Sequence, residues 1–256
     1  MYANYHTHTA RCHHSTGTER EYITCACQRG LKVLGFSDHA PYLFPGDYYS
    51  NFRMAPQELH DYFHTLDALR TEFSGQIELH IGFEMEYYPS YFEDTLRFMQ
   101  NYPIEYLLLG QHFLFDEMEH VYSGAATDDE SVLAQYVHQT EAALRTGRFT
   151  YFAHPDLIRY TGPTAIYERH FTPLIRTAKE MQIPLELNIL GLSTNRHYPD
   201  TRFWRLVAEL DAPCIIGCDA HHVDDVAKPS DIQAAQDYLA QFGLTPLQQV
   251  VLRAPF

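Results

Sequence analysis

Seven short segments rich in apolar and β-branched residues recur along this chain of 256 residues, and a longer stretch with helical periodicity follows each of them. The segments cover residues 2–5, 33–36, 77–83, 106–109, 150–153, 185–188 and 214–217. Such alternation predicts parallel β/α units, because a parallel strand needs a long crossover before it can pair with the next. Since no linker-like tract or internal repeat interrupts the pattern, we expect one domain over residues 1–256.

Three of the intervening stretches carry the spacing of a capping box, in which two side chains satisfy backbone donors at the start of a helix. The pairs are Thr18 with Glu21, Thr127 with Glu130, and Ser230 with Gln233. The longest irregular stretch spans residues 40–55 and contains two prolines and a glycine, and a helix is expected from Pro56 onward. We expect this loop to cover a site.

Side chains that bind metal ions follow six of the seven predicted strands. They occur in His6-Thr7-His8, Asp38-His39, Gly82-Phe83-Glu84, Gln111-His112, His154-Pro155-Asp156 and Asp219-Ala220-His221. In a parallel β/α barrel the carboxyl ends of the strands meet on one face, so these side chains become neighbours. A single histidine at a strand end is more often an ordinary hydrogen-bonded residue, but the joint pattern predicts a metal cluster.

The chain has sixteen histidines, and those outside the strand ends serve as a comparison. Six of them fall in predicted helices or away from strand ends, and we assign these to structure or solvent contact. They are His60, His64, His80, His120, His138 and His170.

The amino-acid composition limits the kinds of partner that the protein is expected to bind. Eighteen Lys and Arg against 33 Asp and Glu give a net charge of −15, which disfavours binding to nucleic acid. The five cysteines form no paired CxxC sets, so we expect reduced thiols. No apolar run approaches the roughly 18 residues that span a bilayer, and the amino terminus lacks a signal pattern. We therefore expect a cytoplasmic protein without a membrane partner, and the oligomeric state stays open.

The ordered motifs from His6 to His221 resemble those of the PHP (polymerase and histidinol phosphatase) family. Within that family the chain is most similar to the monofunctional histidinol phosphatases. The runs that carry this similarity are 8–14 (HTARCHH), 37–41 (SDHAP), 52–54 (FRM), 110–113 (GQHF) and 153–156 (AHPD). The resemblance implies an α/β fold, a PHP-type distorted (β/α)7 barrel with the metal site at the carboxyl ends of the strands.

The resemblance also implies an activity, the metal-dependent hydrolysis of a small phosphate monoester. The expected reaction converts L-histidinol phosphate to L-histidinol and phosphate in histidine biosynthesis. Alternatives are another PHP phosphoesterase activity, on phosphotyrosine or on a phosphodiester, and a non-catalytic metal-binding protein, because a fold does not fix a substrate.

Three divalent metal ions are implied by the same resemblance. One ion would be held by His6, His8, Glu84 and Asp219; a second by Glu84, His112 and His154; and a third by His14, His39 and His221. The family spacing favours His14 over His13 and His221 over His222, and these neighbours remain alternatives. Mixed imidazole and carboxylate donors suit zinc, iron or manganese without ranking them.

Candidate catalytic and substrate-binding residues complete the predicted site. Asp38 is expected to orient His39 or to transfer a proton, and Asp156 to act in or behind the site. An arginine offers a planar fork of donors that matches phosphate, which makes Arg159, Arg196 and Arg53 candidates. Many family members have an arginine directly after the pair that corresponds to Gly191-Leu192, whereas this chain has Ser193 there and reaches Arg196 three residues later.

Overall fold

The computed structural model describes residues 1–256 and contains a seven-stranded sheet in which every pairing is parallel, with the order β1-β2-β3-β4-β7-β8-β9. The strands are β1 (Ala3–Asn4), β2 (Val33–His39), β3 (Glu78–Met85), β4 (Tyr106–Leu109), β7 (Tyr151–Phe152), β8 (Leu185–Asn188) and β9 (Cys214–Gly217). All seven overlap the segments expected from sequence. The prediction of parallel β/α units is therefore confirmed.

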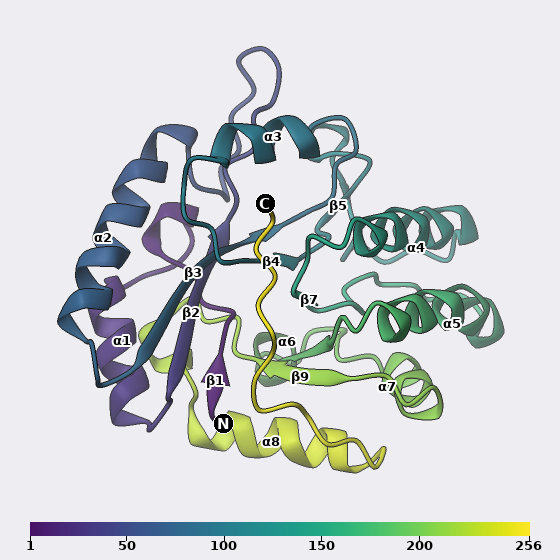
Figure 1. The fold of residues 1–256 in the computed structure, drawn as a ribbon. Helices are drawn as coiled ribbons and strands as arrows, with labels where there is room; N and C mark the ends of the chain where they lie inside the picture. Colours follow the sequence, from purple (N-terminus) through teal and green to yellow (C-terminus); the bar gives the residue numbers. More distant parts are fainter.

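The first and last strands approach each other just beyond their carboxyl ends and nearly close the sheet into a barrel (Figure 1). Thr7 and Ala220 form an isolated parallel bridge. The amide of His8 donates to the Ala220 carbonyl at 3.0 Å, and the Ala220 amide donates to the His6 carbonyl at 3.3 Å. This confirms the expected distorted (β/α)7 barrel, and it places two histidines at the closure.

Helices surround the sheet (Figure 1). The α-helices are α1 (Glu19–Gln28), α2 (Leu59–Glu72), α3 (Phe92–Met99), α4 (Glu130–Arg145), α5 (Thr164–Glu180), α6 (Ile189–Ser193), α7 (Thr201–Glu209) and α8 (Pro229–Ala240). Short 3-10 helices are η1 (Ala10–Cys12), η2 (Pro56–Glu58), η3 (Glu117–Glu119) and η4 (Val223–Asp225). None of the helices has the length and apolar character that crossing a membrane would require.

Helix α1 begins as the sequence predicts. The Thr18 amide donates to Glu21 Oε2 at 2.7 Å, and the Glu21 amide donates to Thr18 Oγ1 at 3.4 Å, so the capping box is complete. The helix then buries Tyr22, Ile23 and Ala26 against the sheet side. Local capping and the apolar stripe thus agree on where this helix starts and which face it buries.

The other two expected capping boxes are wrong. Helix α4 is capped by Asp129, whose carboxylate accepts from the Ser131 amide at 2.8 Å, so Thr127 lies outside the helix. An aspartate one residue before the helix is a stronger cap than a threonine further away. Helix α8 starts at Pro229, which suits the first helical position, so Ser230 lies already inside it.

The carboxy-terminal segment after α8 crosses the end of the barrel where the strands begin (Figure 1). The Leu247 amide donates to the Cys214 carbonyl at 2.8 Å, and the Arg253 amide donates to Thr150 Oγ1 at 3.0 Å. Val250 and Leu252 pack on the small apolar cluster inside the barrel. With this end covered by the chain's own tail, the opposite end remains for a site.

Two segments project at that opposite end. The loop over residues 40–55 leads into η2 at Pro56, as expected from sequence. The second segment is a two-stranded antiparallel hairpin of β5 (Phe113–Leu114) and β6 (Val121–Tyr122), with η3 between its strands. This hairpin was not expected, because each of its strands has only two residues.

Candidate metal centre

A cavity of about 650 Å³ opens at the carboxyl ends of the strands. Its lining includes His39, Glu84, His112, His154, Asp219 and His221. These side chains come from five different strand ends, as expected for the active face of a β/α barrel.

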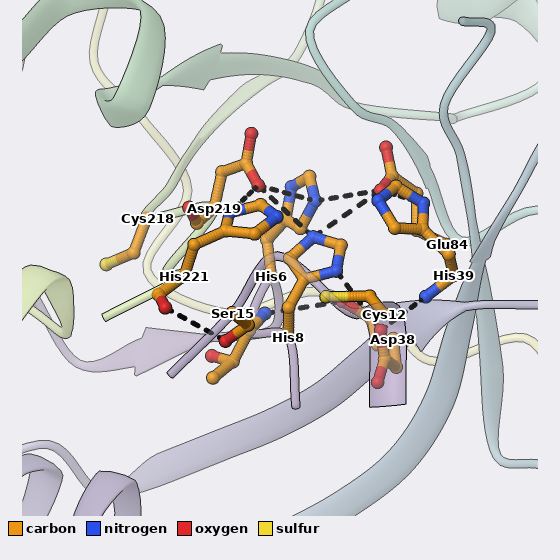
Figure 2. A network of polar contacts seen from close by, with 12 residues as sticks. His6, His8, Cys12, Ser15, Asp38, His39, Glu84, Cys218, Asp219 and His221 are labelled. Carbon is orange, nitrogen blue, oxygen red and sulfur yellow. Dashed lines mark hydrogen bonds and ion pairs between the residues drawn. The ribbon is translucent and has the colours of Figure 1, made fainter. Parts of the chain in front are cut away.

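Four atoms from three strand ends surround one point beside this cavity (Figure 2). His6 Nε2 lies 3.5 Å from both Glu84 Oε2 and Asp219 Oδ1. His8 Nε2 lies 3.5 Å from the same glutamate oxygen and 3.2 Å from the same aspartate oxygen. In a tetrahedral zinc site with ligand bonds of roughly 2.1 Å, neighbouring ligand atoms are about 3.4 Å apart. The four distances between a histidine nitrogen and a carboxylate oxygen therefore match the spacing of a tetrahedral cation site.

Unpartnered nitrogen atoms support the same conclusion. His6 Nε2, both ring nitrogens of His8, His39 Nδ1 and His154 Nδ1 are buried and have no hydrogen-bond partner. Leaving a buried polar atom without a partner costs about 1–3 kcal/mol, so such atoms are rare in proteins. A cation among the facing imidazoles would satisfy the Nε2 atoms, so the residues present fit metal ions.

Two further groups adjoin the first. Glu84 Oε1 lies 2.8 Å from His154 Nε2 and 3.5 Å from His112 Nε2, so this glutamate faces two groups at once. His14 Nε2 lies 2.9 Å from His221 Nε2, and together with His39 these histidines form a third group able to hold an ion.

All nine side chains expected as ligands thus lie in three adjoining groups. Binding of ions by them is a proposal developed below. Of the alternatives, His13 Nε2 lies 3.1 Å from the Tyr49 hydroxyl, and His222 lines the cavity with its Nδ1 2.8 Å from Thr16 Oγ1. By contrast, His14, His39 and His221 form a group able to hold an ion. This geometry favours His14 and His221.

Carboxylates behind the histidines orient their rings. His6 Nδ1 donates to Glu186 Oε1 at 2.8 Å, and His112 Nδ1 donates to Glu86 Oε1 at 2.9 Å. A carboxylate on Nδ1 fixes the ring and leaves Nε2 free for a metal. Glu186 was not among the residues predicted from sequence. Its place within the apolar strand β8 was a signal, because a buried charge requires a partner.

Two glycines make room for carboxylates of the centre. A Cβ atom at Gly110 would collide with Oε1 of Glu84, and one at Gly217 would collide with Oε1 of Glu186. Both positions follow or end a strand of the barrel. Glycine is required there by space rather than by backbone conformation.

The ionisation of the proposed metal ligands depends on their burial and on their charged neighbours. Burial would raise the pKa of Glu84, but His112, His39 and His6 hold it well below the usual range of a glutamate. Burial would likewise raise the pKa of Asp219, but neighbouring imidazoles hold it well below normal. Burial and the charge of the adjacent His8 lower the pKa of His221 to about 3. The two carboxylates are therefore ionised and His221 is neutral at physiological pH. Burial would lower the pKa of His6, His8 and His112, but the carboxylates beside them raise it, so an ion that binds these three rings must displace their protons.

The two expected catalytic aspartates do not line the cavity. Asp38 is fully buried, accepts from the His39 amide at 2.8 Å and lies 3.5 Å from His8 Nδ1. Asp156 accepts from the Trp204 indole at 3.1 Å, and burial raises its pKa to about 7. The geometry suits positioning of ligands by Asp38 and packing by Asp156 better than contact with a substrate.

The three arginines expected to bind phosphate differ in their access to the cavity. Arg196 lines the cavity, and its Nη1 donates to the Tyr198 hydroxyl at 3.0 Å. Arg159 is exposed and outside the cavity lining. Arg53 is 2% exposed, and Glu86 and Glu117 accept from its guanidinium, so no donor is left for phosphate. A buried, saturated guanidinium corrects the expectation of a phosphate contact at Arg53.

Comparison with known proteins agrees with this picture. A curated protein of Deinococcus radiodurans named probable histidinol-phosphatase is 29% identical over 230 residues, 86% of this chain and 86% of the relative. The histidinol-phosphatase of Bacillus subtilis is 25% identical over 255 residues, 86% of this chain and 94% of that protein.

A solved structure shares the fold. It is the histidinol phosphate phosphatase of Lactococcus lactis in complex with zinc, L-histidinol and phosphate, with a TM-score of 0.72 and 20% identity over 97% of this chain and 98% of that chain. The family model described as PHP domain matches residues 4–189. With this match over most of its length, the chain belongs to the PHP domain family.

Proposed function

We propose that the chain is a metal-dependent phosphatase that hydrolyses L-histidinol phosphate to L-histidinol and phosphate. The observation that carries the proposal is the set of four ligand atoms from His6, His8, Glu84 and Asp219 beside a cavity that fits a small molecule. The curated relatives named histidinol-phosphatase support the choice of substrate. Such a biosynthetic enzyme fits the cytoplasmic location expected from the sequence.

Charge explains how an acidic chain attracts a phosphate dianion. Seven neutral histidines with the carboxylates of Glu84 and Asp219 carry about −2, and three divalent ions bring the site to about +4. When bound, such ions neutralise phosphate oxygens and acidify water. We assign the ions to the three groups of ligands described above, as zinc, iron or manganese.

The chain's own side chains would orient the substrate. Arg196 is the one arginine that lines the cavity, and its fork can donate to phosphate oxygens. Asp225 is the one lining carboxylate outside the nine ligand side chains. One of its oxygens accepts from the His222 amide at 3.0 Å, which leaves the other for the ammonium group of histidinol.

The test measures phosphate release from histidinol phosphate, a phosphotyrosine peptide and a phosphodiester, on protein loaded with manganese, zinc or iron. We expect a strong preference for histidinol phosphate that His8→Ala abolishes. His64→Ala, on the exposed face of α2, is the matched control and should retain activity. Preference for the phosphotyrosine peptide or the phosphodiester would overturn histidinol phosphate as the substrate. No activity on any of the three substrates would favour a non-catalytic metal-binding protein.

A further inference from the structure

One wall of the cavity is aromatic. Phe52, Phe113 and Tyr122 all line it, with ring centroids 5.7 Å apart between the two phenylalanines and 5.6 Å apart between Phe113 and Tyr122. The Phe52 ring lies 5.5 Å from the His39 ring and nearly perpendicular to it. The wall therefore begins beside the metal centre, within reach of a group attached to a phosphate held there.

This aromatic wall comes from two separate segments. Phe52 belongs to the loop over residues 40–55, whereas Phe113 and Tyr122 belong to the β5–β6 hairpin. Neither segment is part of the barrel. Their relative position must therefore be fixed by contacts between them.

Arg53 supplies most of those contacts, and the Tyr48 hydroxyl adds one by donating to Glu117 Oε1 at 3.0 Å. The Nε and Nη2 atoms of Arg53 donate to Glu117 Oε2 at 2.8 and 2.5 Å, which ties the loop to η3 of the hairpin. Its Nη1 donates to the Ala40 carbonyl at 2.9 Å, and both Nη atoms donate to Glu86 Oε2 at 3.2 Å. All five donors of the guanidinium are used, which makes the attachment rigid.

The attachment also reaches the metal centre. Glu86 accepts from Arg53 through Oε2 and from His112 Nδ1 through Oε1. The guanidinium carbon lies 4.5 Å from the centroid of the adjacent Phe52 ring, so the arginine holds that ring from behind as well. One buried arginine thus sets the aromatic wall and a metal-side histidine together.

We propose that Phe52 is a specificity-determining residue. With Phe113 it receives a planar ring of the leaving group, and Arg53 is the positioning residue that holds Phe52 in place. This inference rests on the proposed function, because histidinol carries an imidazole that such a wall can stack. A ringless phosphate would bind the metal centre without using the wall.

The test compares kcat/KM for histidinol phosphate and for L-alaninol phosphate, which keeps the amino alcohol and lacks the ring. Phe52→Leu should lower kcat/KM about 10-fold for histidinol phosphate, mainly through KM, and less than about 2-fold for alaninol phosphate. Phe113→Leu should act in the same direction, and Arg53→Lys should reproduce the loss of ring preference. Tyr49→Leu, in the same loop but 64% exposed and outside the cavity lining, should leave both values unchanged.

Equal losses on both substrates in Phe52→Leu and Phe113→Leu would overturn the inference, since the wall would then be structural only. Unchanged kinetics on both substrates would overturn it as well. If the proposed function is wrong, the result differs, because the wild-type protein is then inactive on histidinol phosphate. In that case phenyl phosphate and propyl phosphate replace the two amino alcohol phosphates. Equal losses of kcat/KM on these two substrates in Phe52→Leu would again reject a role of the aromatic wall in specificity.

Discussion

Glu186 accepts a hydrogen bond from His6 Nδ1 at 2.8 Å, and both side chains are fully buried although 180 residues separate them in the chain. The other oxygen of Glu186 accepts from the His154 amide at 3.0 Å. One carboxylate on β8 therefore orients the His6 side chain at the end of β1 and holds the backbone of His154 at the end of β7. Because the hydrogen bond occupies Nδ1 of His6, Nε2 is left facing Glu84 and Asp219.

Replacing this carboxylate should weaken metal binding. We expect Glu186→Gln to lower metal affinity about 10- to 100-fold, because the amide no longer supplies the negative charge that strengthens the imidazole as a ligand. Titration of the stripped protein with zinc measures the change. Glu209→Gln, at an exposed position of α7, is the control. An unchanged affinity in Glu186→Gln would show that the contact is not needed to orient His6.

A methyl group at Gly110 should displace Glu84. Gly110→Ala places a Cβ against Oε1 of that glutamate, so we expect loss of bound metal from a chain that still folds. Gly30→Ala is the control, because it strains a positive φ of 80° without touching any neighbour, and it should cost about 1 kcal/mol with full metal content. Full metal content in Gly110→Ala would contradict the close approach.

We expect Asp38 to affect activity by positioning the proposed metal ligands rather than by contact with the substrate. It lies outside the cavity lining, and its Oδ2 accepts from the Thr9 amide at 3.3 Å while Oδ1 accepts from the His39 amide. Asp38→Asn places an amide group among these donors, so we expect lower turnover together with lower metal content. Metal analysis beside the activity assay separates the two roles. A large loss of turnover with full metal content would restore a catalytic role for Asp38.

Arg196 and Arg159 form a matched pair for phosphate binding. Arg196→Gln should raise KM about 10- to 100-fold, since a hydrogen bond to a charged group contributes about 1.5–3 kcal/mol. Arg159→Gln removes the same charge outside the cavity and should leave KM near the wild-type value. Steady-state kinetics at fixed ionic strength decide the matter. Equal effects of the two changes would point to a general charge effect.

Glu105 offers a stability test away from the centre. Burial would raise its pKa, but the hydrogen bond from His80 Nδ1, 2.5 Å away, and the charge of Arg70 lower it. A lowered pKa contributes stability above the unfolded-state value of 4.5, and this contribution is lost as the pH falls through the folded-state pKa. Urea unfolding should show Glu105→Gln less stable by about 1–3 kcal/mol at pH 7.5, with the difference shrinking toward acid. A difference that is constant with pH would exclude this carboxylate as its source.

The alternation of strands and helices was sufficient to predict parallel β/α units with metal-type side chains at six strand ends, because such strand ends converge whatever lies between them. The closed barrel and the complete set of nine ligands, including His14, were implied by the resemblance to the PHP family. The partners behind the cluster follow another rule. Glu186 lies within a strand, and Glu117 lies in a short hairpin that has no periodic pattern. Pairing of Arg53 with Glu86 and Glu117 depends on how two loops meet, which only the folded chain defines.

A titration of activity against added metal tests the proposed metal centre most directly. Protein stripped with a chelator is mixed with zinc, manganese or iron in known equivalents, and phosphate release from histidinol phosphate is recorded at each step. We predict no activity without metal and a rise that levels off near three equivalents per chain, with no recovery in His8→Ala. Full activity in the stripped protein, or none at saturating metal, would contradict the assignment of the histidine cluster as the catalytic centre.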